Sequence, residues 1–143
     1  MPVTDDAAIT DILNRVRSIA VVGASPNPAR PSFGVTRVLV AHGYDVFPVN
    51  PGHGGGEIAG LKAYATLADL PQPVDMIDVF RASEHVSGVL DEVLAMDPRP
   101  SVLWTQLGVL DHESAARAEA EGLTVVMDRC PAIEISRETG IPH

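Results

Sequence analysis

Residues able to bind an anion lie at the first connection between a strand and a helix. A short apolar run, residues 19–22, is followed by the small residues 23–25, and Arg30 comes a few positions later. A mostly β-branched run bounded by glycine is typical of a strand buried on both faces. From Ser32 onward apolar residues recur at helical spacing, and Ser32 is expected to cap that helix. Because the N–H groups at a helix start attract anions, this order of elements predicts a phosphate site.

This first loop differs from the dinucleotide fingerprint G-x-G-x-x-G. Ser25 stands where the fingerprint has its second glycine, and Pro28 stands where it has its third. The loop contains no acidic residue, and its three prolines keep it open and stiff. A tight connection in an ordinary α/β protein is the alternative explanation for the same residues.

The end of the second strand, residues 44–49, argues against NAD. An NAD-binding fold usually ends this strand with Asp or Glu, whose carboxylate holds the ribose hydroxyls. Here Val49 is followed by Asn50 and Pro51. A carboxylate would repel a phosphorylated ribose, whereas Asn50 and His53 would not. His53 either contacts that ligand or is an exposed loop imidazole.

Strand-like runs alternate with helical patterns along the whole chain. The expected strands are residues 19–22, 44–49, 74–80, 101–105 and 123–127, and the expected helices begin near Thr4, Ser32, Ser83 and Asp111. This alternation predicts an α/β fold: a doubly wound, mainly parallel, five-stranded sheet with helices on both faces. The unusual residues then all follow strand ends and meet at one edge of the sheet. The tail after Ser136 is expected to lack regular structure.

Two residues at this edge have two explanations each. Arg81 follows the third strand and either meets a ligand or pairs with Glu84 or Asp78. Cys130 is either a small core residue or a reactive thiol, since the neighbouring cation of Arg129 would lower the pKa of the thiol.

Composition narrows the class of protein. The 143 residues carry a net charge of −9, with 45% apolar and 20% charged residues. This balance predicts one globular domain whose core covers about residues 5–136. An acidic chain lacks the basic surface that nucleic acid requires. One cysteine and the absence of a long apolar run predict a cytoplasmic protein with no membrane segment.

Five segments in order resemble one known family. They are VVGASP (21–26), PVNPG (48–52), DVFR (78–81), WTQLG (104–108) and VMDRCP (126–131). Together they resemble the stand-alone CoA-binding proteins, small Rossmann-like proteins similar to the N-terminal domain of the succinyl-CoA synthetase α subunit. The resemblance covers about residues 5–136.

The resemblance implies coenzyme A or acyl-CoA as the ligand. The implied phosphate contacts are Gly23, Ala24, Ser25, Arg30, Ser32, Phe33 and Gly34. The implied adenosine contacts are Val49, Asn50, Pro51, His53, Phe80 and Arg81, and Gln106 and Gly108 line the pantetheine path. A mixed disulfide between Cys130 and the CoA thiol is a further hypothesis. The synthetase's phosphohistidine lies in a second domain without a counterpart here, so the ligand is implied and the ligase reaction is not.

Three classes of function remain open on the sequence. The first is a module that binds CoA without turning it over. The second is an enzyme, either an NAD(P)-linked oxidoreductase or an acyl-CoA-handling protein that acts with a partner. The third is a redox or ligand sensor with an unknown protein partner. No base–nucleophile pair accompanies His112, and no His or Cys cluster has metal-ligand spacing, so no catalytic or metal residue is predicted.

Overall fold

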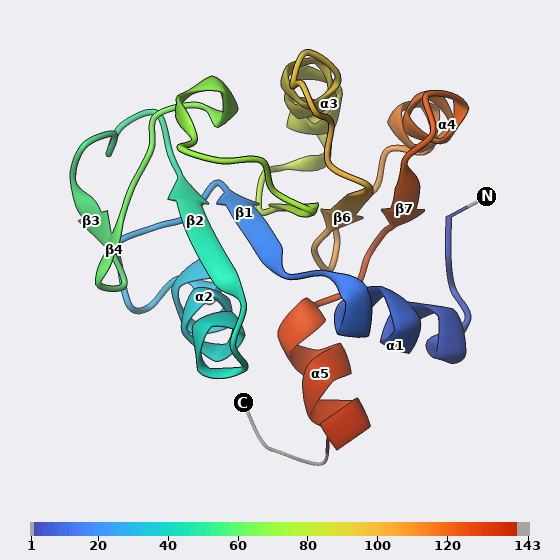
Figure 1. The fold of residues 1–143 in the computed structure, drawn as a ribbon, viewed down its shortest axis with the longest axis horizontal. Helices are drawn as coiled ribbons and strands as arrows, with labels where there is room; N and C mark the ends of the chain where they lie inside the picture. The colour runs from blue at the N-terminus through green and yellow to red at the C-terminus, as the bar shows by residue number, and fades with distance from the viewer. Residues whose placement is uncertain (1, 140–143) are drawn as a thin grey trace.

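A five-stranded parallel sheet forms the centre of the molecule (Figure 1). The computed structural model describes residues 2–139. The strands lie in the order β2-β1-β5-β6-β7. Their bounds are Ser18–Val22 for β1, Asp45–Val49 for β2, Met76–Val79 for β5, Val102–Thr105 for β6 and Thr124–Val126 for β7. The five predicted strands and their parallel arrangement are confirmed, with ends that differ from the predicted ones by no more than two residues.

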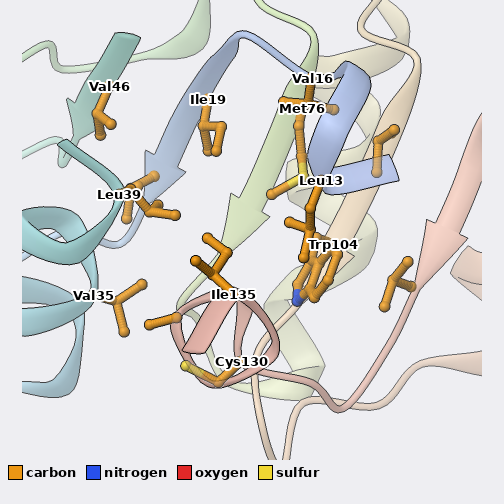
Figure 2. Close-up of a cluster of buried hydrophobic side chains, with 14 of the residues drawn as sticks. Leu13, Val16, Ile19, Val35, Leu39, Val46, Met76, Trp104, Cys130 and Ile135 are labelled. Atoms are coloured by element: carbon orange, nitrogen blue, oxygen red, sulfur yellow. The ribbon is translucent and has the colours of Figure 1, made fainter. Parts of the chain in front are cut away.

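Helices cover both faces of this sheet. On one face lie α1 (Asp6–Arg15), α2 (Pro31–Ala41) and α5 (Pro131–Thr139); on the other lie α3 (Val86–Leu94) and α4 (His112–Ala120). Successive side chains of a strand point to opposite faces. Ile19 and Met76 therefore join the cluster under α1, α2 and α5 (Figure 2), whereas Ala20 and Ile77 join the cluster under α3 and α4. The predicted doubly wound arrangement is confirmed.

Short elements fill two of the connections. After β2 the chain forms a hairpin of β3 (Glu57–Ile58) and β4 (Leu61–Lys62). The 3₁₀ turns η1 (Leu67–Asp69) and η2 (Ser83–His85) precede β5 and α3 respectively.

Three sequence expectations about helix ends are wrong. Ser32 lies inside α2, and its hydroxyl instead accepts a hydrogen bond from the Ser25 N–H at 3.0 Å. Ser83 opens a 3₁₀ turn, and its hydroxyl accepts from the N–H of Leu110. In both cases the serine hydroxyl accepts a hydrogen bond from an N–H group outside its own helix, and so it does not cap that helix. The residues just after Ser136 continue α5 as far as Thr139, because Ile135 packs in the core and anchors that helix; residues 140–143 lie outside the described part of the chain.

The strand order reverses beside β1. From β1 the chain first goes to β2 on one side and then crosses to β5 on the other. In open α/β sheets ligands bind at such a switch point, outside the carboxyl ends of the strands. The loops after β1 and β5 therefore border the expected ligand crevice.

Gly23 allows these two loops to come together. Its φ angle is +87°, and a Cβ added there would clash with the carbonyl group of Phe80 and touch the Cδ of Arg81. Glycine adopts positive φ without the steric cost that other residues incur. Gly23 is therefore required both by the turn and by the close approach of the two backbones.

We predict that Gly23→Ala lowers the free energy of unfolding by about 2 kcal/mol or more, because the methyl group adds both backbone strain and a clash. Urea denaturation measures this change. Gly88→Ala is the matched control, since Gly88 lies in α3 with no atom within 4 Å of an added Cβ. The control is expected to be neutral or stabilising by about 0.5–1 kcal/mol. Equal stability of Gly23→Ala and the unmodified protein would contradict the prediction.

Candidate functional site

The loop after β1 is tied to the end of β2 by hydrogen bonds. The N–H groups of Gly23 and Ala24 both donate to the carbonyl oxygen of Val49, at 2.9 and 3.3 Å. The side-chain amide of Asn50 donates to the Ala24 carbonyl at 2.8 Å, and its oxygen accepts from the Gly52 N–H. Two of the sequence-predicted segments, residues 21–26 and 48–52, therefore meet here, and Asn50 links the two loops.

The start of α2 offers an anion fewer donors than most helix starts, because Pro31 has no N–H group and the Phe33 N–H donates to the Arg30 carbonyl at 3.1 Å. The first N–H groups of a helix have no acceptor within that helix. Arg30 occupies the N-cap position without a capping side chain and is exposed, and no acidic residue lies in the first turn. Because the Ser25 N–H already donates to Ser32, an anion here would be held mainly by the helix start and by Arg30.

A cavity of about 490 Å³ lies next to this helix start. Its walls are largely apolar and come from the starts of α2 and α5 and from the loops after β5 and β6. The lining residues are Pro31, Val35, Phe80, Arg81, Ala82, Gln106, Leu107, Val109, Cys130 and Ile133. An aliphatic ligand segment fits such walls, and Arg81 and Gln106 are the lining residues with strong hydrogen-bonding side chains.

Arg81 lies where the loop after β1 and the cavity meet. Its stem passes beside Gly23, and its side chain lines the cavity. The expected alternative, an ion pair with Glu84 or Asp78, is wrong. Glu84 lies 3.8 Å from His85, and the Asp78 carboxylate interacts with Gln106. In the part of the chain that the structure describes, Arg81 forms no ion pair, so its charge is available to a ligand.

A buried carboxyl lies directly behind the cavity wall. Asp78, in β5, is fully enclosed, and its Oδ1 accepts a hydrogen bond of 2.8 Å from Nε2 of Gln106. Its Oδ2 has no partner among the described residues. Burial raises the pKa of Asp78 from its ordinary value of 3.8 to about 7, and the hydrogen bond from Gln106 opposes part of that rise.

Cys130 is enclosed rather than activated. The thiol lines the cavity and lies at the edge of the cluster that contains Val35 and Ile135 (Figure 2). The expectation that Arg129 activates it is wrong, because the guanidinium lies 3.1 Å from Glu134 and 3.6 Å from Asp6. Burial raises the pKa of the Cys130 thiol, although backbone N–H groups at the start of α5 oppose the rise. The hypothesis of a mixed disulfide with CoA assumed a lowered pKa of the Cys130 thiol, and the structure instead raises that pKa.

Some predicted site residues lie away from the cavity wall. His53 and Pro51 are exposed in the loop after β2, beside the loop that follows β1. The Gly108 N–H donates to Asp128 Oδ1 at 2.6 Å, and its neighbours Leu107 and Val109 line the cavity instead. Phe33 and Gly34 belong to the first turns of α2.

The sequence expectations missed the buried Asp78 and several lining residues, namely Pro31, Val35, Ala82, Leu107, Val109 and Ile133. Ile133 reaches the cavity from α5, and Pro131 at the start of that helix was the available signal for it. Asp78 was considered only as a partner for Arg81. An acid within the apolar run 76–79 was the available signal that this residue is special.

Other hollows among the described residues lie away from the predicted site, and one of about 160 Å³ lies between the ends of α1 and α2. A second hollow of about 370 Å³ lies between residues 67–73 and 95–98 and contains none of the residues singled out above. Within residues 2–139 no group of three or more potential ligands is arranged for a metal ion. No helix in the same range is long and apolar enough to span a bilayer.

We predict that Asp78→Asn changes stability in a pH-dependent way. When a carboxyl has a higher pKa in the folded than in the unfolded protein, the protein loses stability as the pH increases from the unfolded pKa to the folded pKa. Relative to the unmodified protein, the variant should therefore gain about 4 kcal/mol in free energy of unfolding between pH 4 and pH 8. Urea denaturation across this range measures the difference. A difference that stays constant with pH would show that Asp78 titrates normally in the folded protein.

We predict that Cys130 reacts with iodoacetamide at pH 7.5 about tenfold or more slowly than glutathione does, because the thiol is buried and its pKa is raised. Mass spectrometry follows the reaction without ambiguity, since the chain has one cysteine. The urea-unfolded chain is the control and should react as fast as glutathione. Reaction of the folded protein at the glutathione rate would contradict the enclosed position of the thiol.

Comparison with known proteins agrees with this geometry. The sequence pattern of a family described as CoA binding domain matches residues 17–136. An uncharacterised Bacillus subtilis protein, YneT, is 40% identical over 124 residues, which are 87% of this chain and 89% of that protein. A solved Thermus thermophilus structure, cell-free ID.343, superposes with a TM-score of 0.87 at 40% identity and covers 94% of this chain and 98% of its own.

A larger enzyme contains a related segment. The alpha subunit of ADP-forming acetate–CoA ligase I from Pyrococcus furiosus is 34% identical over 80 residues. The match covers 53% of this chain and 17% of that subunit. The family pattern matches most of the chain, and the fold superposes on that of a solved relative. The chain therefore belongs to the CoA-binding domain family.

Proposed function

We propose that this protein binds coenzyme A or acyl-CoA at the switch point of the sheet. The cavity of about 490 Å³ beside the start of α2 carries the proposal. Pro31 and Val35 of α2 line it, so a ligand with its phosphates at that helix start can extend an aliphatic arm directly into it. CoA combines these features in one molecule, a charged nucleotide joined to a long, mostly apolar arm.

The parts of the ligand have natural positions in this proposal. The phosphates lie at the first turn of α2, with the charges of Arg30 and Arg81 close by, and residues 23–25 border them although their N–H groups already donate to Val49 and Ser32. The adenosine follows the segment from Val49 to His53, and the pantetheine arm passes Phe80 and Gln106. The membership of the family supports CoA over other anions of similar size.

The end of β2 favours CoA over NAD. Asn50 stands where an NAD-binding fold usually has an acid, and both ends of its side chain are already engaged with Ala24 and Gly52. No carboxylate is therefore present at this point to hold two ribose hydroxyls or to repel a 3′-phosphate.

We predict that calorimetry detects saturable binding of CoA and acetyl-CoA, and much weaker binding of NAD and NADP. Dephospho-CoA should bind roughly 10–100-fold more weakly than CoA, since it lacks the 3′-phosphate and its charge-assisted hydrogen bonds. Tighter binding of NAD or NADP than of CoA would contradict the proposal.

The same titrations test the position of the phosphates. Arg30→Ala should weaken CoA binding about five- to tenfold. Arg37→Ala is the matched control, because Arg37 is an exposed arginine of the same helix but lies about two turns from its start. Equal effects of the two variants would assign the loss to net charge, and no effect of Arg30→Ala would move the phosphates away from this loop.

A further inference from the structure

Asp78 and Gln106 form a polar pair at the wall of an otherwise apolar cavity. Gln106 lines the cavity and is 7% exposed, whereas Asp78 behind it is 0% exposed and is not part of the wall. The contact between them, Nε2 to Oδ1 at 2.8 Å, is the hydrogen bond that the structure gives the Gln106 side chain within residues 2–139. A ligand in the cavity can therefore reach Gln106 directly and can reach Asp78 only through it.

The carboxyl decides which end of the Gln106 amide faces the ligand. A carboxylate accepts hydrogen bonds and donates none, so it selects the NH₂ end of the amide. The carbonyl oxygen Oε1 of Gln106 therefore points away from Asp78. No described residue donates to Oε1, and Asp78 Oδ2, not Oε1, is the unpaired side-chain atom that is fully enclosed. A proton on Asp78 fits on the free Oδ2 and leaves Oδ1 as the acceptor, so the protonated carboxyl permits this orientation, whereas the carboxylate requires it.

We propose that Asp78 is a positioning residue that holds Gln106 with its carbonyl oxygen toward the cavity, and so makes this wall specific for a ligand arm that carries an N–H donor. This inference rests on the proposed function and deepens it. The pantetheine arm contains secondary amides, and an amide N–H crossing an apolar cavity loses its water and needs an acceptor. An alkyl chain of the same length would leave the Gln106 oxygen unpaired.

A purely structural role for Asp78 explains the arrangement less well. An apolar residue in the middle of a buried parallel strand needs no partner, and the neighbours of Asp78 in β5, Ile77 and Val79, are of that kind. Enclosing a carboxyl with one unpaired oxygen is unfavourable for folding. Because Asp78 bonds Gln106, which lines the cavity, an effect on the ligand accounts for this unfavourable burial.

Two ligands separate the arm from the nucleotide in the test. Coenzyme A contains both the nucleotide and the pantetheine arm, whereas adenosine 3′,5′-bisphosphate contains the nucleotide alone. With Asp78→Asn, whose amide can donate to Gln106 and turn it around, calorimetry should show about tenfold weaker CoA binding, the loss of one hydrogen bond. Binding of the bisphosphate should stay within about twofold of the unmodified protein, because no arm is involved.

A reciprocal variant provides the rescue. In the double variant D78N/Q106E the new amide donates to the new carboxylate, whose second oxygen again faces the cavity as an acceptor. CoA affinity should return to within about threefold of the unmodified protein. Gln106→Met, which removes both polar ends at nearly constant size, should reproduce the tenfold loss for CoA alone and serves if Asp78→Asn does not fold.

The outcomes distinguish this inference from the proposed function. Unchanged CoA binding in both Asp78→Asn and Gln106→Met would overturn the inference and leave CoA binding intact. An equal loss for both ligands, or no recovery in D78N/Q106E, would assign Asp78 a structural role. Absence of binding of either ligand to the unmodified protein would overturn the proposed function and this inference with it.

Discussion

The contact between Gly23 and the carbonyl group of Phe80 governs the site. It brings the loop after β1 against the loop after β5, at the point where the strand order reverses. The Arg81 stem packs on the same glycine, and the start of α2 follows a few residues later. A side chain at position 23 would separate these loops and with them the helix start and the cavity. The site therefore depends on a backbone contact that no other residue type permits without strain.

The sequence predicted the sheet well because its signals are local. Each strand is a short, mostly β-branched run, and the residues that follow it must lie at the carboxyl edge once the strands are parallel. Residues such as Asn50, Phe80 and Gln106 were placed at the correct edge by this reasoning. The predictions failed where a distant partner decides. Ser32 resembles a cap in sequence, but its hydroxyl bonds the Ser25 N–H.

The cavity shows the same limit more clearly. It is assembled from the starts of two helices and two loops, and α5 was not expected at all. The apolar neighbours of Asp78 in β5 signalled its burial, but its partner Gln106 lies 28 residues later and could not be read from them. Cys130 illustrates the opposite error. Arg129 adjoins it in sequence, but the guanidinium points to Glu134, so chain adjacency did not mean electrostatic contact.

The three prolines of the loop after β1 have a consequence for ligand capture. The rings of Pro26, Pro28 and Pro31 fix three φ angles in the unfolded and the folded chain alike, so this segment has less conformational entropy to lose on binding. The loop consequently has little freedom left to surrender when it closes on an anion. They also lack N–H groups, and because Pro31 opens α2 it removes one donor from the first turn of that helix. In the proposed complex, a segment of this stiffness would select an anion by its shape, because it has little freedom to rearrange for a different spacing of charges.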